Sequence, residues 1–319
     1  MSRLQNDRPR REVRVGDVSI RPLDPERDAP GVVDLIREVF PYTVTTVESW
    51  RQQFATIPER ARNAAWIAAA DGLIAGRAEA HLNWFSESRT AVGGVSVRTG
   101  FRRRGIGTRL WELVDNHVHE LGPIRMLTSF VETDHGVAFA QARGFVEARA
   151  ETLACVDPRM VDTSALDATE PSTRIVPLRD VPVEEIYEVD VRTTADVPMT
   201  DQLTDIRFDD WLDAIWRRPT ITRDGSFAAI VDDRVVCITM LGANVEVGRG
   251  FNEYTGTLSP YRGRGLALLV KLASLRWATE NGIEAVWTTN DETNAAMLSV
   301  NQRLGYRPSA RRVEYVRSG

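Results

Sequence analysis

Lysine is nearly absent from this 319-residue sequence: Lys271 is the only lysine among 40 basic residues, and the formal net charge is −5. This negative balance argues against a broad phosphate-binding surface, so we expect no nucleic-acid partner. Long apolar runs are missing as well, because no stretch approaches the roughly 20 apolar residues of a membrane-spanning helix. We therefore expect no membrane partner.

Cysteine is also scarce. Cys155 and Cys237 are the only two, they lie far apart, and neither has a cysteine or histidine neighbour at metal-ligand spacing. This pattern predicts neither a disulfide nor a metal site. The arginine-rich N-terminus lacks the apolar core of a secretory signal, so the cytoplasm is the expected location.

The length suits two domains of about 150 residues better than one. Internal repeats agree with this: IRPL (20–23) recurs as IVPL (175–178), RRRGIG (102–107) as RGRGLA (262–267), and ARGF (142–145) as RLGY (303–306). The order of these landmarks is the same in both halves, and so long a period indicates duplicated domains. We predict an N-terminal domain over 1–156, a linker over 157–172 that is rich in Asp, Ser, Thr and Pro, and a C-terminal domain over 173–319.

Each half shows the same succession of elements, which predicts an α/β fold with one mixed sheet per half. A short strand (18–21; 174–176) precedes a helical segment (31–39; 183–191). A hairpin follows, turned at Asp71-Gly72 or Asp232-Asp233. An extended segment (93–98; 252–258) then leads through a turn into an amphipathic helix (106–121; 266–281). A strand (125–131; 285–289), a helix and a last strand complete each half.

The turns before the amphipathic helices, FRRRGIGTRL (101–110) and YRGRGLALL (261–269), combine glycine with arginine. A turn of this kind leaves main-chain N–H groups exposed at the positive end of the helix dipole, which predicts a pyrophosphate site. A P-loop is excluded because neither turn continues with the lysine and hydroxyl of GxxxxGK[ST]. A dinucleotide fold is excluded because Leu110 and Leu268 stand where the third glycine belongs.

The two turns resemble the (Gln/Arg)-x-x-Gly-x-(Gly/Ala) signature of the GNAT N-acetyltransferases. The matching residues are Arg102-x-x-Gly105-x-Gly107 and Arg262-x-x-Gly265-x-Ala267. The resemblance covers nearly the whole chain, twice, and the arrangement is similar to the tandem members of that superfamily, mycothiol synthase among them. It implies two GNAT-fold acyltransferase domains and acetyl-CoA as the cofactor.

The resemblance also implies which residues bind coenzyme A. In the C-terminal half they are Thr255, Thr257, Leu258, Arg262, Gly263, Arg264, Gly265, Leu266 and Ala267. In the N-terminal half they are Val95, Val97, Arg102, Arg103, Arg104, Gly105, Ile106, Gly107 and Thr108.

The segment 289–306 resembles the strand and helix that border the pantetheine arm in this family. Its polar residues are Asn290, Asn294 and Asn301. Asn294 and Asn301 are two helical turns apart and share a face, from which they could hydrogen-bond an amide-rich arm. Capping of the helix by Asn290 or Asn294 is the alternative interpretation. The N-terminal half lacks all three asparagines.

Amine acetylation needs a base, an oxyanion donor and an acid for the leaving thiolate. Glu253 is the only carboxylate of the strand before the C-terminal turn, and alternation would place it on one face with Thr255 and Thr257. It is the candidate base, although a surface glutamate would look the same. The tyrosine that usually serves the family as acid is replaced by Asn301, so Tyr254 and Tyr306 are the nearest candidates, and Tyr306 also suits a core position.

The corresponding N-terminal strand has no carboxylate, which favours catalysis by the C-terminal half. Catalysis by the N-terminal half instead stays open, because Arg102–Gly107 is the more complete signature.

A carboxylate-rich segment over 192–218 is either a mouth for a cationic amine or a solvated helix face.

The sequence thus predicts an acetyl-CoA-dependent N-acetyltransferase, a monomer or homodimer, that acts by direct attack of a small-molecule primary amine. The alternatives are a non-catalytic coenzyme A sensor or scaffold and a protein N-acetyltransferase.

Overall fold

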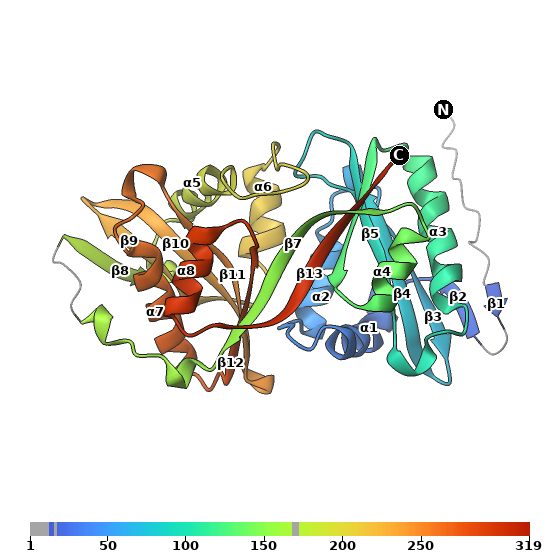
Figure 1. Cartoon of the computed structure of the whole chain (residues 1–319), viewed down its shortest axis with the longest axis horizontal. Coiled ribbons are helices and arrows are strands. Elements are labelled where there is room, and N and C mark those ends of the chain that lie inside the picture. The colour runs from blue at the N-terminus through green and yellow to red at the C-terminus, as the bar shows by residue number, and fades with distance from the viewer. Residues whose placement is uncertain (1–12, 16–17, 168–171) are drawn as a thin grey trace, which may run out of the picture.

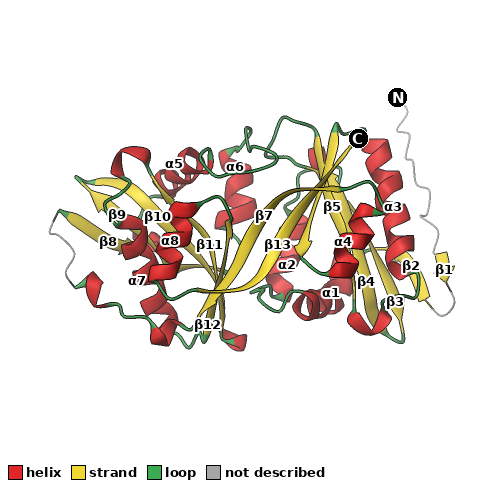
Figure 2. Cartoon of the chain, in the orientation of Figure 1, coloured by secondary structure: helices red, strands yellow, loops and turns green. Residues whose placement is uncertain are grey.

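The computed structural model describes residues 13–15, 18–167 and 172–319, which form two halves side by side, each with a sheet flanked by helices (Figures 1 and 2). The strands of the N-terminal half are β1 (Val13–Val15), β2 (Val18–Pro22), β3 (Ala64–Ala70), β4 (Leu73–Leu82), β5 (Thr90–Val97), β6 (Arg125–Val131) and β7 (Val146–Val156). Those of the C-terminal half are β8 (Thr173–Pro177), β9 (Ile221–Val231), β10 (Arg234–Asn244), β11 (Arg249–Thr257), β12 (Ala285–Asp291) and β13 (Arg307–Ser318).

The helices of the first half are α1 (Pro25–Val39), α2 (Val47–Ala55), α3 (Ile106–Leu121) and α4 (Asp134–Gln141). Those of the second half are α5 (Val183–Thr194), α6 (Phe208–Trp211), which continues as a π-helical turn over Leu212–Trp216, α7 (Leu266–Glu280) and α8 (Ala295–Arg303). The short 3-10 turns are η1 (Glu59–Ala61), η2 (Thr99–Phe101), η3 (Pro158–Met160), η4 (Ser164–Leu166), η5 (Leu178–Asp180), η7 (Val245–Val247) and η8 (Ser259–Tyr261).

The two halves share one continuous sheet, because they exchange their last strands. The strand order is β1-β2-β3-β4-β5-β6-β13-β7-β12-β11-β10-β9-β8. Strand β13 of the C-terminal half pairs with β6 of the N-terminal half, while β7 pairs with β12, and β7 and β13 pair with each other. In Figure 1 these two long strands cross between the halves in opposite directions. A side chain on β13 can therefore belong to a site in the N-terminal half.

Local sequence signals explain the elements well. The hairpin turns predicted at Asp71-Gly72 and Asp232-Asp233 are present, with φ of 53° and 75° in the first and 50° and 57° in the second. Positive φ at both central residues is the type I′ geometry that suits Asn, Asp and Gly. Helix α3 covers the predicted 106–121, and α7 ends at its Asn281 cap with Gly282 in the left-handed region.

Helices cover both faces of the N-terminal sheet. Helices α1 and α2 pack with Ile67 and Ile74 on one face. Helix α3 packs on the other, against the alanine-rich β3 and β4, where Ala78 and Ala80 are buried. Because side chains alternate along a strand, Arg77, Glu79 and His81 of β4 point to the α1 side.

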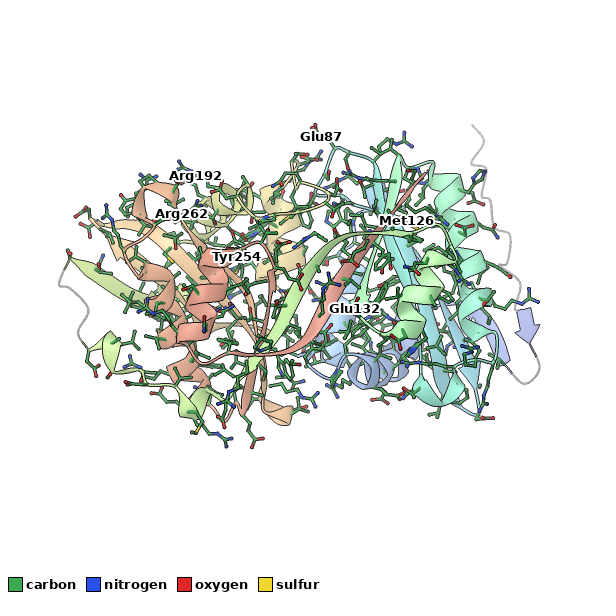
Figure 3. All side chains as sticks on the ribbon, viewed as in Figure 1. Glu87, Met126, Glu132, Arg192, Tyr254 and Arg262 are labelled. Atoms are coloured by element: carbon green, nitrogen blue, oxygen red, sulfur yellow. The ribbon has the colours of Figure 1, made fainter. Side chains whose placement is uncertain are left out.

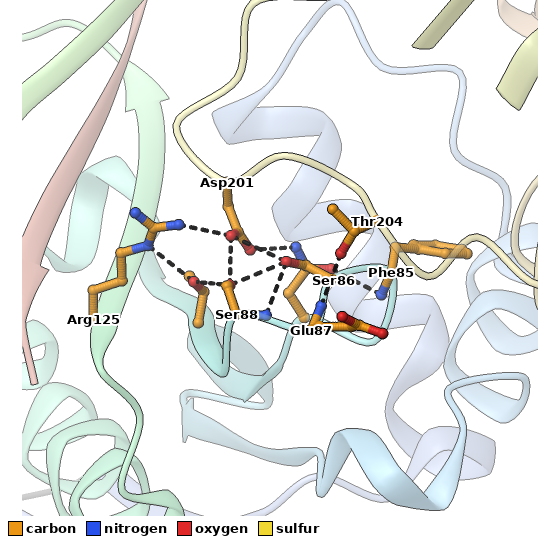
Figure 4. A network of polar contacts seen from close by, with 9 residues as sticks. Phe85, Ser86, Glu87, Ser88, Arg125, Asp201 and Thr204 are labelled. Carbon is orange, nitrogen blue, oxygen red and sulfur yellow. Dashed lines mark hydrogen bonds and ion pairs between the residues drawn. The ribbon is translucent and has the colours of Figure 1, made fainter. Parts of the chain in front are cut away.

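Loops from each half dock onto the other half. The loop after α1 places the ring of Tyr42 6.1 Å from the rings of both Phe251 and Trp287. Reciprocally, the loop between α5 and α6 brings Asp201 to the β4–β5 loop and β6 (Figure 4). The Asp201 carboxylate accepts hydrogen bonds from Asn83 (2.7 Å), Ser88 (2.5 Å), Ser86 (3.2 Å) and Arg125 (2.8 Å).

Burial alone would raise the pKa of the Asp201 carboxyl, but these hydrogen bonds hold the pKa below its usual value. Asp201 thus joins the two halves as a buried carboxylate.

Candidate active site

Both glycine-arginine turns adopt the same backbone geometry. Arg103 and Gly105 have φ of 62° and 79°, and the matching Gly263 and Gly265 have 75° and 76°. Helices α3 and α7 begin directly afterwards, and no side chain caps either N-terminus. The first N–H groups of both helices are therefore available to an anion.

The first arginine of each signature holds its turn to the preceding strand. Arg102 Nε donates to Val97 O (3.1 Å), and Arg262 Nε donates to Thr257 O (3.0 Å). Arg104 and Arg264 stack over the rings of Phe101 and Tyr261. The guanidinium groups of the two turns have different partners: Arg102 meets His135, whereas Arg262 forms an ion pair with Asp196. Figure 3 shows Arg262 and Arg192 on the upper side of the C-terminal half.

A cavity of about 930 Å³ opens beside the N-terminal turn. One part of its wall comes from the turn, the first residues of α3, helix α4 and the residues after α4, with Arg102, Arg103, Gly105, Gly107, Thr108, His135 and Arg143. Another comes from β5 and β6, including Gly93, Gly94, Val95, Val97 and Ser129. The polar side chains Arg77, Glu79 and His81 of β4, Phe40 after α1, and Arg312 of β13 also line it.

The cavity exists because β5 and β6 part. They pair only from Thr90 to Val92 with Arg125 to Leu127, so beyond Val92 strand β5 pairs with β4 alone. Gly94 borders this gap, since a Cβ there would lie 3.2 Å from Thr128 Oγ1 of β6, whereas a Cβ on Gly93 would overlap the carbonyl oxygen of Glu79 on the paired strand β4. An extended arm with amide groups could pair with the main chain of β5 here.

In the C-terminal half, polar side chains occupy the place that corresponds to this cavity. Strands β11 and β12 part after Asn252 and Thr288. Lys271, at the position in α7 that Trp111 has in α3, is 2% exposed; its Nζ donates to Asn252 Oδ1 (2.5 Å) and lies 5.1 Å from the ring centre of Tyr306. Burial lowers the pKa of Lys271 to about 7.

A smaller cavity of about 230 Å³ in the C-terminal half lies beside η8, lined by Arg192, Thr193, Asp196, Arg234 and the segment 258–261. It adjoins the strand that precedes the turn.

The predicted base Glu253 contacts Arg218, with 3.3 Å between Oε2 and the guanidinium. The alternation expected for Glu253, Thr255 and Thr257 does not hold, because the register of β11 against β10 shifts at Glu253. This bulge brings Thr255 Oγ1 to Asn252 Oδ1 (3.1 Å) and Thr239 Oγ1 (2.8 Å), away from Glu253. A bulge of one residue has no signal in the strand's own sequence.

The two candidate acids are buried in separate contacts. The Tyr254 hydroxyl is 2.6 Å from Thr193 Oγ1, and it donates to Asp190 O (3.2 Å). Tyr306 is 6% exposed and packs in the core beneath α7 and α8. Burial raises the pKa of both phenols well above the usual value, so both keep their protons.

The remaining predicted coenzyme A residues of the C-terminal half are engaged in contacts within that half. Asn294 caps α8, accepting from Met297 N (3.2 Å), as the alternative interpretation required. Asn301 donates to Asn290, and its Oδ1 is buried without a hydrogen bond. Thr257 Oγ1 donates to Cys237 Sγ (3.1 Å), and Leu258 is buried.

The acidic segment 192–218 is mostly paired. Arg262, Arg60, Arg207 and Arg217 neutralise Asp196, Asp210, Asp205 and Asp213, and Asp201 joins the halves. Just upstream, burial raises the pKa of Asp190 to about 6, against hydrogen bonds from Trp211 and Thr194. This pairing does not favour an acidic mouth for a cationic amine.

Sequence reasoning missed Arg77, Glu79, His81 and Arg312. The segment GRAEAHL does carry a signal, because polar residues alternate with buried alanines over Arg77–His81. Arg312 could not be assigned to the N-terminal half, since strand exchange leaves no local pattern.

Among the described residues, no group of three or more His, Cys, Asp or Glu side chains is arranged to hold a metal, and no helix combines the length and apolarity that crossing a bilayer requires.

Comparison with known proteins agrees with the two-fold repeat. The acetyltransferase (GNAT) family model matches residues 29–145 and again 184–306. No curated protein matches the sequence.

Solved structures share the fold at low identity. A tandem GNAT protein from the clavulanic acid biosynthesis pathway aligns over 94% of this chain and 98% of its own, with a TM-score of 0.72 and 20% identity. A GCN5-related N-acetyltransferase from Sphaerobacter thermophilus aligns over 96% and 97%, with a TM-score of 0.69 and 16% identity.

A putative acetyltransferase from Pyrococcus horikoshii aligns over 96% of this chain and 91% of its own, with a TM-score of 0.60 and 14% identity.

The predictions of a tandem GNAT chain, of its α/β fold and of acetyl-CoA as cosubstrate are confirmed. The chain belongs to the acetyltransferase (GNAT) family, with one GNAT domain in each half and acetyl-CoA as its cosubstrate.

Proposed function

We propose that the N-terminal half transfers the acetyl group of acetyl-CoA to the primary amine of a small molecule, which attacks directly without a covalent enzyme intermediate. The observation that carries the proposal is the cavity of about 930 Å³, which joins the anion-binding turn to polar side chains of β4. Its size is that of a small-molecule site. The pathway named for the similar clavulanic acid protein supports a small-molecule acceptor.

The residues present fit the cosubstrate. The uncapped start of α3 and the turn Arg102–Thr108 would hold the pyrophosphate, and the unpaired edge of β5 around Val95 and Val97 would hold the amides of the arm. Bound acetyl-CoA supplies a thioester as the acyl donor. In the C-terminal half, the place that corresponds to this cavity is occupied by the side chains of Lys271 and Asn252. That half is therefore the less suitable one for binding acetyl-CoA.

Glu79 is the proposed general base. Its side chain is 33% exposed in the cavity wall, and Arg77 Nη2 lies 3.1 Å from its Oε1. The carboxylate would first take a proton from the substrate ammonium, and the neutral amine would then attack the thioester. An N–C bond forms as the C–S bond breaks, and the second nitrogen proton leaves to water. The leaving thiolate belongs to a thiol with a pKa of roughly 8.5, which is low enough for water to protonate it without a tyrosine.

The location of the acetyl-CoA site is tested with two matched variants, Gly107→Glu and Ala267→Glu, at equivalent positions of α3 and α7. A Cβ at Gly107 would lie 3.5 Å from the Phe139 ring and 3.6 Å from Val97, ordinary contact distances, and a carboxylate in a first helical turn is favourable. Calorimetric titration with acetyl-CoA should show binding lost in Gly107→Glu and kept in Ala267→Glu. The reverse result would move the site to the C-terminal half and make Glu253 the next target.

Catalysis is tested with Glu79→Gln. We expect kcat/KM for amine acetylation to fall about 10²- to 10⁴-fold, the usual contribution of a general base, with the acetyl-CoA affinity unchanged. A coenzyme A sensor would bind acetyl-CoA without turnover with any amine. A protein acetyltransferase would modify peptide lysines in preference to small amines.

A further inference from the structure

Arg312 is a cation of one half that faces the cavity of the other. It lies on β13 opposite Val131 of β6 and Glu151 of β7. Its guanidinium donates to Ser129 Oγ (2.8 Å) and Glu151 Oε2 (2.8 Å), and its side chain is still 36% exposed. Ser129 lines the cavity together with Arg312.

Glu151, the ion-pair partner of Arg312, also bonds to a second arginine. The other oxygen of Glu151 accepts from Arg149 (2.8 Å), whose Nε donates to Asp291 (3.0 Å). Glu151 therefore keeps a cation when Arg312 turns to a ligand. A guanidinium has five N–H groups, and two of those on Arg312 are used in these bonds, so it can still take up a carboxylate through a two-pronged contact.

The surroundings place Arg312 on the acceptor side of the sheet. Burial raises the pKa of Tyr42, while the charge of Arg312 lowers it, so Arg312 lies near the loop that follows α1. Phe40 of that loop lines the cavity, as does Glu79, which points to the α1 side. On this side of the cavity wall, away from the turn and α4, the cations are thus Arg77, which is paired with Glu79, and Arg312.

We propose that the acceptor is a primary amine that also carries a carboxylate, and that Arg312 binds this carboxylate. The inference rests on the proposed function, because it names the substrate class of the same site. Glu79 receives the ammonium end and Arg312 the anionic end, so each end meets an opposite charge. The substrate site is then complete only when the C-terminal half supplies β13.

The neighbouring Arg311 provides a matched control. Alternation along β13 turns it to the opposite face, where it pairs with Glu132, Glu147 and Glu292. Arg311→Gln removes the same charge from the same strand without touching the cavity.

The experiment uses the full chain, acetyl-CoA and a panel of ω- and α-amino acids of three to eight carbons. Each acid is compared with its methyl ester, which keeps the amine and removes the negative charge. Product is measured by mass spectrometry for the wild type and for Arg312→Gln, Arg312→Lys and Arg311→Gln.

We expect the wild type to prefer at least one free acid over its ester by about 10- to 100-fold in kcat/KM, the range of a charge-assisted contact. Arg312→Gln should remove this preference by raising KM for the acid while the ester stays unchanged. Arg312→Lys should keep part of it, and Arg311→Gln all of it.

Equal use of acids and esters by the wild type would overturn the inference, and so would an equal loss for both substrates in Arg312→Gln. If Arg312→Gln unfolds, Arg312→Gln combined with Glu151→Gln keeps the local charge balanced and gives the same test. Failure of the proposed function looks different: acetyl-CoA does not bind, or no amine of either kind is acetylated.

Discussion

Lys271 offers a direct test of the buried polar cluster in the C-terminal half. Its ammonium group is 2% exposed, with Asn252 Oδ1 as its hydrogen-bond acceptor and the Tyr306 ring beside it, and burial lowers its pKa from 10.5 to about 7. The unfolded chain should titrate near the ordinary lysine value of about 10.4. Between about pH 7 and 10.4 the unfolded state therefore binds more protons than the folded state.

The sign of the effect follows from this difference. Stability rises with pH wherever the unfolded state binds more protons, so the free energy of unfolding should increase from about pH 7 to 10 and be lowest below pH 7. A tenfold change in proton affinity is worth about 1.4 kcal/mol, so the difference between the ends of this window is about 5 kcal/mol at most. Lys271→Met keeps an unbranched chain of similar length and leaves Asn252 Oδ1 with the Thr255 hydroxyl as donor.

The assay can follow this one residue. Because Lys271 is the only lysine, labelling with ¹³C-lysine gives a single side-chain signal, which should titrate near pH 7 in the folded protein. Denaturant unfolding at pH 6, 8 and 10 should show a rising free energy for the wild type and a flatter one for Lys271→Met. Arg276→Gln, which removes a half-exposed cation from the same helix, should keep the wild-type slope. A lysine signal that titrates near 10.5, or an unchanged slope in Lys271→Met, would refute the reasoning.

Two further predictions concern the interface and the cavity. Asp201→Ala removes the acceptor of Arg125 and of Ser88 from a buried junction, so the free energy of unfolding should fall by about 2–4 kcal/mol, measured by denaturation at pH 7. Since the pKa of Asp201 is held low, this contribution should disappear only as the pH falls below its usual value of 3.8; a constant contribution down to pH 2 would contradict it. Gly94→Val extends a side chain from β5 toward Thr128 in the cavity, so acetyl-CoA affinity should fall at least about tenfold by calorimetry with thermal unfolding little changed, and an unaltered affinity would place the arm elsewhere.

The sequence predicted elements whose causes are local. The hairpin turns at Asp71-Gly72 and Asp232-Asp233, the full extent of α3 and the cap of α7 all depend on neighbouring residues, and all are present. The repeat also located both glycine-arginine turns, because their glycines and arginines are contiguous, and the structure gives both the same backbone geometry. What could not be predicted depends on contacts between distant segments. The bulge at Glu253 appears only against β10, and the Lys271–Asn252 contact joins a helix and a strand that sequence spacing does not relate.

The exchange of β7 and β13 gives a physical reason for keeping both halves in one chain. The paired edges of β6 and β12 are completed by strands from the opposite half, so each half alone would lose a strand and expose an unpaired sheet edge. Only one half needs an open cavity for this arrangement to persist. The other can replace the cavity lining with Lys271, Asn252 and Asn301 and still contribute β13, and with it Arg312. A second domain that provides one wall of the cavity is constrained at that wall and is free to change elsewhere, so two similar turns can stand beside such different interiors.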